Sequence, residues 1–148
     1  MNASLTPVIV QSLFALILAL LLGAAIGLER QIRKHPAGLH TNALVCMGSA
    51  AYVLVALLVT QDSSPTRIAA QVVSGVGFIC AGVIWHEGAT VRGLNTAATI
   101  WCTAAIGILA GLNFFLMAIF ATVILLVANI ALHWVEHRYF NVLPPQGE

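Results

Sequence analysis

Polar side chains that could do chemistry gather where long apolar segments begin or end. A carboxylate and a guanidinium close the first apolar segment, and further polar groups open the second and the fourth. These residues are Glu29, Arg30, His40, Thr41, Asn42, Arg92, Asn95, Thr96 and Thr99. Polar groups at membrane depth are costly and are functional candidates by default. The sequence therefore predicts a polar site, either a docking surface for a partner or a small-ion site.

Each of these residues also has a structural interpretation. Asn and Thr satisfy free backbone groups at helix starts, and Arg extends along apolar surface to reach lipid headgroups. We favour a function for the set because three helix ends would bring polar groups to one level. There Arg92 can neutralise Glu29 if the two side chains approach, and His40 would sense pH near neutrality.

Other candidate groups predict less. Asp62, Arg67 and Gln71 form a smaller polar set near the opposite surface, where Asp62 and Arg67 suit an ordinary interfacial ion pair. Three thiols at similar depth could bind a soft metal, although buried cysteine usually packs as a small apolar residue; they are Cys46, Cys80 and Cys102. We predict no metal site and no cofactor.

Enzymatic activity is not expected. The chain has neither a Gly-x-Ser-x-Gly nucleophile elbow nor a His-Glu-x-x-His zinc motif. Nucleic-acid binding is also not expected, because it depends on clustered cations and the net charge is +1.

The composition indicates that most of the chain is surrounded by lipid. Of the 148 residues, 60% are hydrophobic and 7% are charged, whereas a soluble domain carries about 25% charged residues. A helix needs about 20 apolar residues to cross a bilayer. Five segments fit that requirement: residues 7–28, 38–60, 68–85, 94–111 and 114–134. We predict one all-α domain, a bundle of five transmembrane helices, with the first helix retained because no basic residue precedes it.

Lysine and arginine predict the orientation of the bundle. One side would hold five of them, Arg30, Arg33, Lys34, Arg92 and Arg138, and the other side would hold Arg67. Because cytoplasmic loops are enriched in such residues, the N-terminus is expected outside and the C-terminus in the cytoplasm.

Glycines at close-packing spacing predict where helices approach one another. The candidates are Gly23, Gly27, Gly75, Gly77, Gly82, Gly107 and Gly111. Small residues let transmembrane backbones pack closely, either within one chain or between two chains. Both uses stay open, and we expect a homodimer or a larger homo-oligomer, since twofold symmetry is the commonest.

Four segments carry a more specific pattern. They read I-G-L-E-R at 26–30, A-G-L-H-T-N at 37–42, R-I-A-A-Q followed by G-V-G-F-I-C-A-G between 67 and 82, and R-G-L-N-T-A-A-T-I-W at 92–101. In order and spacing they resemble the MgtC/SapB family of bacterial inner-membrane proteins, whose transmembrane domain has five helices. His40 replaces a usual Arg and Cys80 a usual Gly. Because the sequence stops at Glu148, before the soluble domain of longer members, it resembles the short, SapB-like branch.

The resemblance implies a regulator in the bacterial inner membrane. Family members are linked to magnesium homeostasis, acid stress and virulence, and they act by binding other inner-membrane proteins, such as the F-type ATP synthase or a sensor or transport protein. A small oligomeric ion transporter or channel is the alternative. Against it, no carboxylate is expected near the midplane of the membrane, where transporters hold their ions.

Overall fold

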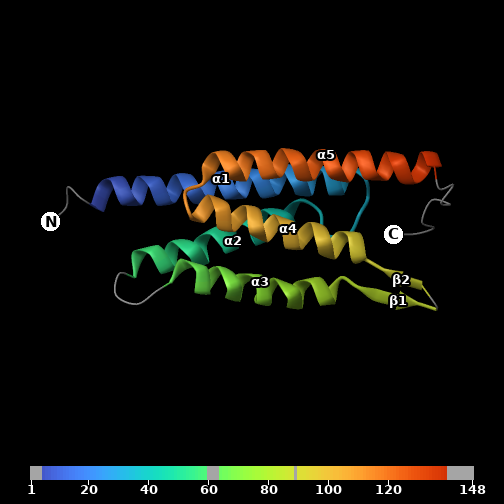
Figure 1. Ribbon diagram of the computed structural model, residues 1–148, viewed down its shortest axis with the longest axis horizontal. Helices are drawn as coiled ribbons and strands as arrows, with labels where there is room; N and C mark the ends of the chain where they lie inside the picture. Colours follow the sequence, from blue (N-terminus) through green and yellow to red (C-terminus); the bar gives the residue numbers. More distant parts are fainter. Residues whose placement is uncertain (1–4, 60–63, 89, 140–148) are drawn as a thin grey trace.

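The structure, a computed structural model, describes residues 5–59, 64–88 and 90–139. Five α-helices and one short β-hairpin follow one another along the chain (Figure 1). The elements are α1 (Leu5–Ile32), α2 (Leu39–Leu58), α3 (Pro65–Gly82), β1 (Trp85–Glu87), β2 (Thr90–Arg92), α4 (Leu94–Gly111) and α5 (Phe115–Tyr139).

The helices are those of a multi-pass membrane protein. Helices α1, α2, α4 and α5 are each long and apolar enough to cross a bilayer. Helix α3 is apolar but shorter, over Thr66–Gly82. The predicted count of five helices is confirmed, and four of them are long enough to span. That α3 also crosses the membrane stays a prediction.

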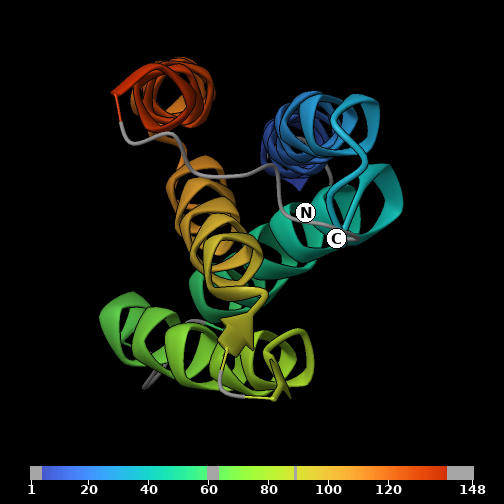
Figure 2. The same cartoon turned by 90° about the vertical axis from the view of Figure 1, so that its right-hand side faces the viewer.

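Helix α4 is the centre of the bundle. It contacts each of the other four helices, and Figure 2 shows α3 on one side of it and α1 with α5 on the other. Small side chains permit this central position, because Ala97, Ala104, Gly107, Ala110 and Gly111 are all buried on α4. Helix α3 is therefore a peripheral helix, held through α4 and α2.

A β-hairpin between α3 and α4 corrects the prediction of a purely helical chain. Strands β1 and β2 pair antiparallel, with Trp85 opposite Arg92. The hairpin depends on two glycines with positive φ, Gly88 at 62° and Gly93 at 85°. A Cβ at Gly93 would collide with the carbonyl oxygen of Val83. Three-residue strands are too short to show alternation in the sequence, so α3 was expected to continue to residue 85.

Helix α1 runs to Ile32, four residues past its predicted end at 28. It closes with a Schellman motif: the His35 amide donates to the Arg30 carbonyl and the Lys34 amide to the Gln31 carbonyl, both over 3.0 Å. Lys34 takes the left-handed position with φ of 59°. Glu29 and Arg30 consequently lie on the last turns of a helix and not in a loop.

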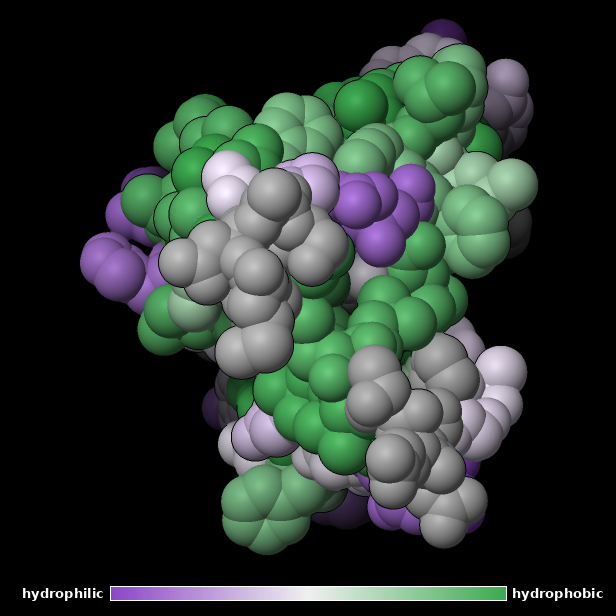
Figure 3. All heavy atoms as spheres, turned by 90° about the vertical axis from the view of Figure 1, so that its left-hand side faces the viewer, coloured by the Kyte–Doolittle hydropathy of each residue, from purple (hydrophilic) through white to green (hydrophobic). Residues whose placement is uncertain are grey.

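The two ends of the bundle differ in their number of Lys and Arg residues. The end of α1, the hairpin, the start of α4 and the end of α5 meet at one end (Figure 1), which thus holds Arg30, Arg33, Lys34, Arg92 and Arg138. We call it the basic end. Figure 3 looks onto the opposite end, whose surface is mostly hydrophobic.

Candidate functional site

The predicted polar cluster lies at the basic end, on the last turns of α1, the first turn of α2, the strand β2 and the start of α4. Burial divides its members into three groups. Arg30, Asn42, Thr96 and Thr99 are buried; Glu29, Thr41 and Arg92 are half-buried; His40 and Asn95 are exposed. The buried and exposed groups are suited to different tasks.

Arg30 is the largest fully buried side chain among the described residues, with 1% of its surface exposed. It follows the buried Ile26 by one helical turn, so the extension of α1 carries its guanidinium into the bundle. There Nη2 donates a hydrogen bond of 2.7 Å to the hydroxyl of Thr96. Arg30 therefore joins α1 to α4 and does not extend to the headgroups.

Asn42 joins the connection after α1 to α4. Its amide nitrogen Nδ2 donates to the carbonyls of Ala37 at 2.6 Å and Gly38 at 3.1 Å. Its oxygen Oδ1 lies 3.0 Å from the hydroxyl of Thr103 on α4. Because Ala37 has a φ of 56°, the carboxamide holds a connection with an unusual backbone. These contacts give Asn42 a structural role, but not that of a helix cap, because α2 has no side-chain cap hydrogen bond and Gly38 stands at its N-cap.

Thr103 was absent from the predicted cluster. It lies four residues after Thr99 on the same helix face, a spacing that could have identified it. Its hydroxyl has one proton to share between Asn42 Oδ1 and the Thr99 carbonyl at 2.9 Å. Thr99 itself donates to the Asn95 carbonyl of its own helix over 3.0 Å, so its hydroxyl makes no bond between helices in the described part of the chain.

The expected pair between Arg92 and Glu29 is wrong. Glu29 pairs with Arg33 over 2.8 Å, and Arg92 pairs with Glu87 over 2.6 Å. The extra turn of α1 places Arg33 four residues after Glu29, and the hairpin brings Glu87 beside Arg92. Both features were missing from the interpretation of these residues as helix ends and loops.

The remaining candidates are spread over the molecule. Arg67 and Gln71 are exposed on α3, and Asp62 lies outside the described residues. Cys46 is buried, while Cys80 donates to the carbonyl of Ala97 over 3.2 Å. Within residues 5–59, 64–88 and 90–139, no group of three or more His, Cys, Asp or Glu side chains could hold a metal ion.

The glycines fall into two classes. A Cβ at Gly23 would lie 2.5 Å from the Asn42 carbonyl oxygen, and one at Gly27 would lie 2.6 Å from the Leu39 Cα. A Cβ at Gly107 or at Gly111 would also collide with α2, at the carbonyl oxygens of Cys46 and Ala50, and Gly107 is the tighter of the two. In contrast, a Cβ would meet nothing within 4 Å at the α3 glycines, Gly75, Gly77 and Gly82. The glycines of α1 and α4 therefore serve packing within the chain. The α3 glycines face open space, so a contact between two chains stays possible there.

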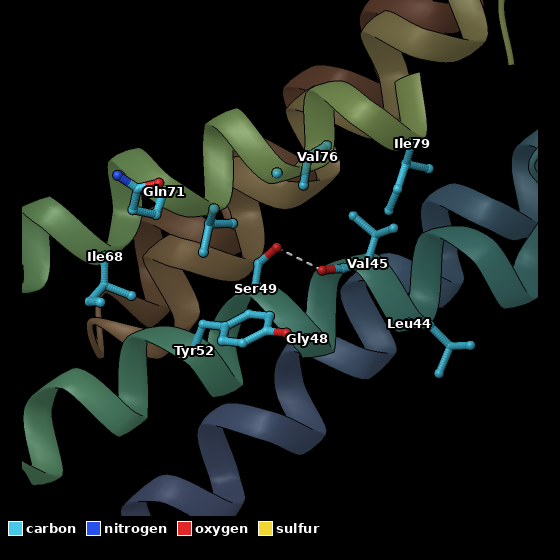
Figure 4. Close-up of a pocket in the computed structure, with 11 residues that line it drawn as sticks. Leu44, Val45, Gly48, Ser49, Tyr52, Ile68, Gln71, Val76 and Ile79 are labelled. Carbon is cyan, nitrogen blue, oxygen red and sulfur yellow. Dashed lines mark hydrogen bonds between the residues drawn. The ribbon is translucent and has the colours of Figure 1, made fainter. Parts of the chain in front are cut away.

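A groove of about 550 Å³ lies between α2 and α3, away from the polar cluster (Figure 4). Its walls are apolar apart from Ser49, Tyr52 and Gln71. Ser49 donates to the Val45 carbonyl of its own helix over 2.7 Å. Sequence patterns did not predict this groove, because it depends on how far α3 stands from α2.

Comparison with known proteins identifies the family. Residues 16–138 match the model of the MgtC family. The chain belongs to the MgtC family. It is 56% identical over 133 residues to the Protein MgtC of Salmonella typhimurium (strain LT2), covering 90% of this chain and 57% of that protein. It is 55% identical over 122 residues to the uncharacterized protein slr0014 of Synechocystis sp., covering 82% and 52%.

The Protein MgtC of Brucella abortus (strain 2308) is 56% identical over 111 residues, which are 75% of this chain and 47% of that protein. The chain thus spans about half the length of the curated relatives that it matches. No solved structure matches it. The resemblance seen in the sequence motifs is confirmed at the level of the family.

In this MgtC-family chain, three of the four motif segments supply the contacts of the buried polar groups. Arg30 comes from the segment at 26–30, Asn42 from the segment at 37–42, and Thr96 from the segment at 92–101. Arg30 bonds Thr96 directly, and Asn42 bonds Thr103, which lies two residues beyond the segment at 92–101. The motifs thus meet at the basic end, where they fix helices α1, α2 and α4 to one another.

Proposed function

We propose that this chain is a regulatory protein of the bacterial inner membrane, which acts by binding other membrane proteins and serves magnesium homeostasis, acid stress or virulence. Its N-terminus would lie outside and its basic end in the cytoplasm, because cytoplasmic ends of membrane proteins are enriched in Lys and Arg. Membership of the MgtC family and identity of 56% to proteins named MgtC support the proposal.

One observation carries the proposal: three of the four buried polar groups of the cluster, Arg30, Asn42 and Thr96, bond to groups of neighbouring elements. The fourth, Thr99, bonds within α4. Arg30 bonds Thr96 and Asn42 bonds Thr103, so these side chains hold helices together. An ion pathway uses polar groups that face a water-filled passage or coordinate the ion. This arrangement favours a rigid platform for a partner over a transporter.

The exposed groups of the basic end are the proposed docking surface. Lys34, His40, Trp85, His86 and Asn95 are exposed on the α1–α2 connection, the hairpin and the starts of α2 and α4, which lie at the same end of the bundle (Figures 1 and 2). An exposed Trp beside mixed polar groups is typical of an interface, where aromatic anchors contribute most of the binding energy. The buried pairs would hold these segments in place.

The proposal is tested with the double variant His40→Ala and Asn95→Ala, which alters two exposed side chains and none of the buried bonds. We expect the variant to reach normal levels in the membrane but to capture severalfold less of its inner-membrane partners from native membranes. A deletion strain that expresses the variant should grow poorly under magnesium limitation. Gln11→Ala is the matched control, because Gln11 is exposed near the start of α1, away from the basic end.

Full capture and full growth by the double variant would contradict the proposed docking surface. Ion flux through the purified chain in liposomes would replace the regulatory proposal with the transporter alternative. Both measurements use the intact chain.

A further inference from the structure

Helix α3 carries a row of four exposed residues at coiled-coil spacing. Gln71, Gly75, Phe78 and Gly82 are separated by four, three and four residues, so they share one face of the helix. Phe78 is 86% exposed, more than any other large hydrophobic side chain among the described residues. We call this row the α3 seam.

The α3 seam alternates one large side chain with two gaps. A Cβ at Gly75 or at Gly82 would meet nothing within 4 Å, and these glycines lie three residues before and four residues after Phe78. Gln71 and Gly75 also line the groove between α2 and α3, and Figure 4 shows Gln71 on the α3 wall of that groove. The seam is thus continuous with the wall of that groove.

The polar end of the seam makes lipid a poor neighbour. Gln71 is exposed and lies six residues into α3, about 9 Å along the helix at its rise of 1.5 Å per residue. A carboxamide facing hydrocarbon loses hydrogen bonds that water would supply. Helix α3 is also the least hydrophobic of the five helices. A surface of this kind is better covered by protein.

We propose that the α3 seam is the interface of a homodimer and that its occupant is the α3 seam of a second copy. A twofold axis along the membrane normal places the two α3 helices side by side and parallel, with equivalent residues at equal depth. This inference goes beyond the proposed function and does not depend on it.

The seam is complementary to itself in shape. In a parallel pair, a knob at position 78 enters a hole formed by residues 75, 78, 79 and 82 of the facing helix. Two of these four are glycines, Gly75 and Gly82, so the hole has room for the aromatic ring of Phe78. The groove beside Gly75 adds space on the same side.

The seam is also complementary to itself in hydrogen bonding. A carboxamide is both donor and acceptor, so Gln71 of one copy bonds the Gln71 of another at the same depth. Such bonds between transmembrane helices are established contributors to association. A second copy supplies this partner by symmetry, whereas an unrelated helix would need a matching polar residue at that depth.

The test measures self-association of the purified full chain in lipid vesicles, by single-molecule photobleaching over a range of protein-to-lipid ratios. Gly75→Leu and Gly82→Leu fill the gaps and are expected to weaken association on the order of tenfold. Gly77→Leu is the matched control: its Cβ also meets nothing within 4 Å, but it points about 200° away from Gly75 around the helix. It should associate like the natural chain.

A second measurement does not depend on added bulk. With the three natural cysteines replaced by alanine, Phe78→Cys is expected to form a disulfide between two copies, and Gly77→Cys is not. A monomeric natural chain, unchanged association of Gly75→Leu, or equal cross-linking at positions 77 and 78 would each overturn the proposal. Because no other protein is present, these results are separate from the test of partner binding.

Discussion

The guanidinium of Arg30 donates a 2.7 Å hydrogen bond to the hydroxyl of Thr96, a residue 66 positions further along the chain. Both side chains are buried, with exposed fractions of 1% and 3%. The bond fastens the end of α1 to the start of α4 beside the basic surface. The stability of the bundle should therefore depend on this pair.

Replacing Thr96 with Val removes the acceptor and keeps the shape of the side chain. Because the bond joins two helices inside a membrane bundle, we expect a loss of about 1–2 kcal/mol in the free energy of unfolding. Denaturation in mixed micelles of a mild detergent and dodecyl sulfate measures it. Thr99→Val is the control, since the Thr99 hydroxyl bonds a carbonyl of its own helix. An equal loss in both variants would show that the contact with Arg30 adds nothing.

The bond between Asn42 and Thr103 predicts coupled effects. Asn42→Ala leaves the carbonyls of Ala37 and Gly38 and the Thr103 hydroxyl without the carboxamide, so we expect a loss of about 1–3 kcal/mol. Combined with Thr103→Val in a double-mutant cycle, the two changes should couple by about 0.6–1.7 kcal/mol. Strict additivity would show that the two side chains act independently.

A glycine packed between helices, Gly107, and a glycine that faces open space, Gly48, predict opposite effects of the same substitution. Gly107→Ala places a Cβ against the Cys46 carbonyl, and overpacking of this kind typically costs about 1–3 kcal/mol. Gly48→Ala meets nothing within 4 Å on α2 and should be neutral or stabilise the helix by about 0.5–1 kcal/mol. Unfolding of both variants in the same micelles gives the comparison. A tolerated Gly107→Ala would mean that α2 and α4 can separate without loss.

The uneven distribution of Lys and Arg between the two ends predicts the orientation. A phosphatase reporter fused after Val142 follows the basic end and should be inactive, because the enzyme needs the oxidising exterior to form its disulfides. The same reporter fused after Gln61, between α2 and α3, should be active. The reverse pattern would place the basic end outside and overturn the orientation.

The sequence alone determined the class of protein and most of its helices. With 7% charged residues, the chain cannot cover itself with a soluble surface. Apolar runs of about 20 residues are uninterrupted enough to be located without neighbours, since each satisfies its own backbone in the membrane. The motif segments then identified the family, because their order and spacing are specific.

Helix ends and the hairpin were harder to predict. Residues 29–32 are polar enough to suggest a loop, yet they continue α1. There Arg30 makes a hydrogen bond to Thr96, and the Schellman motif around Lys34 ends the helix. Trp85–Glu87 and Thr90–Arg92 pair only across a turn, so neither strand has a pattern of its own. The local sequence around Arg30 does not reveal its bond to Thr96, and the sequence of one strand does not reveal its pairing with the other.

Only the tertiary structure decided what each polar or small residue does. Arg30 and His40 both stand at helix ends in the sequence, but the packing of α1 on α4 buries one and leaves the other exposed. Gly107 and Gly75 both fit close-packing patterns, but α2 covers Gly107 and no neighbour approaches Gly75. The physical reason is that spacing fixes which residues share a helix face, whereas a contact requires a second helix to lie against that face.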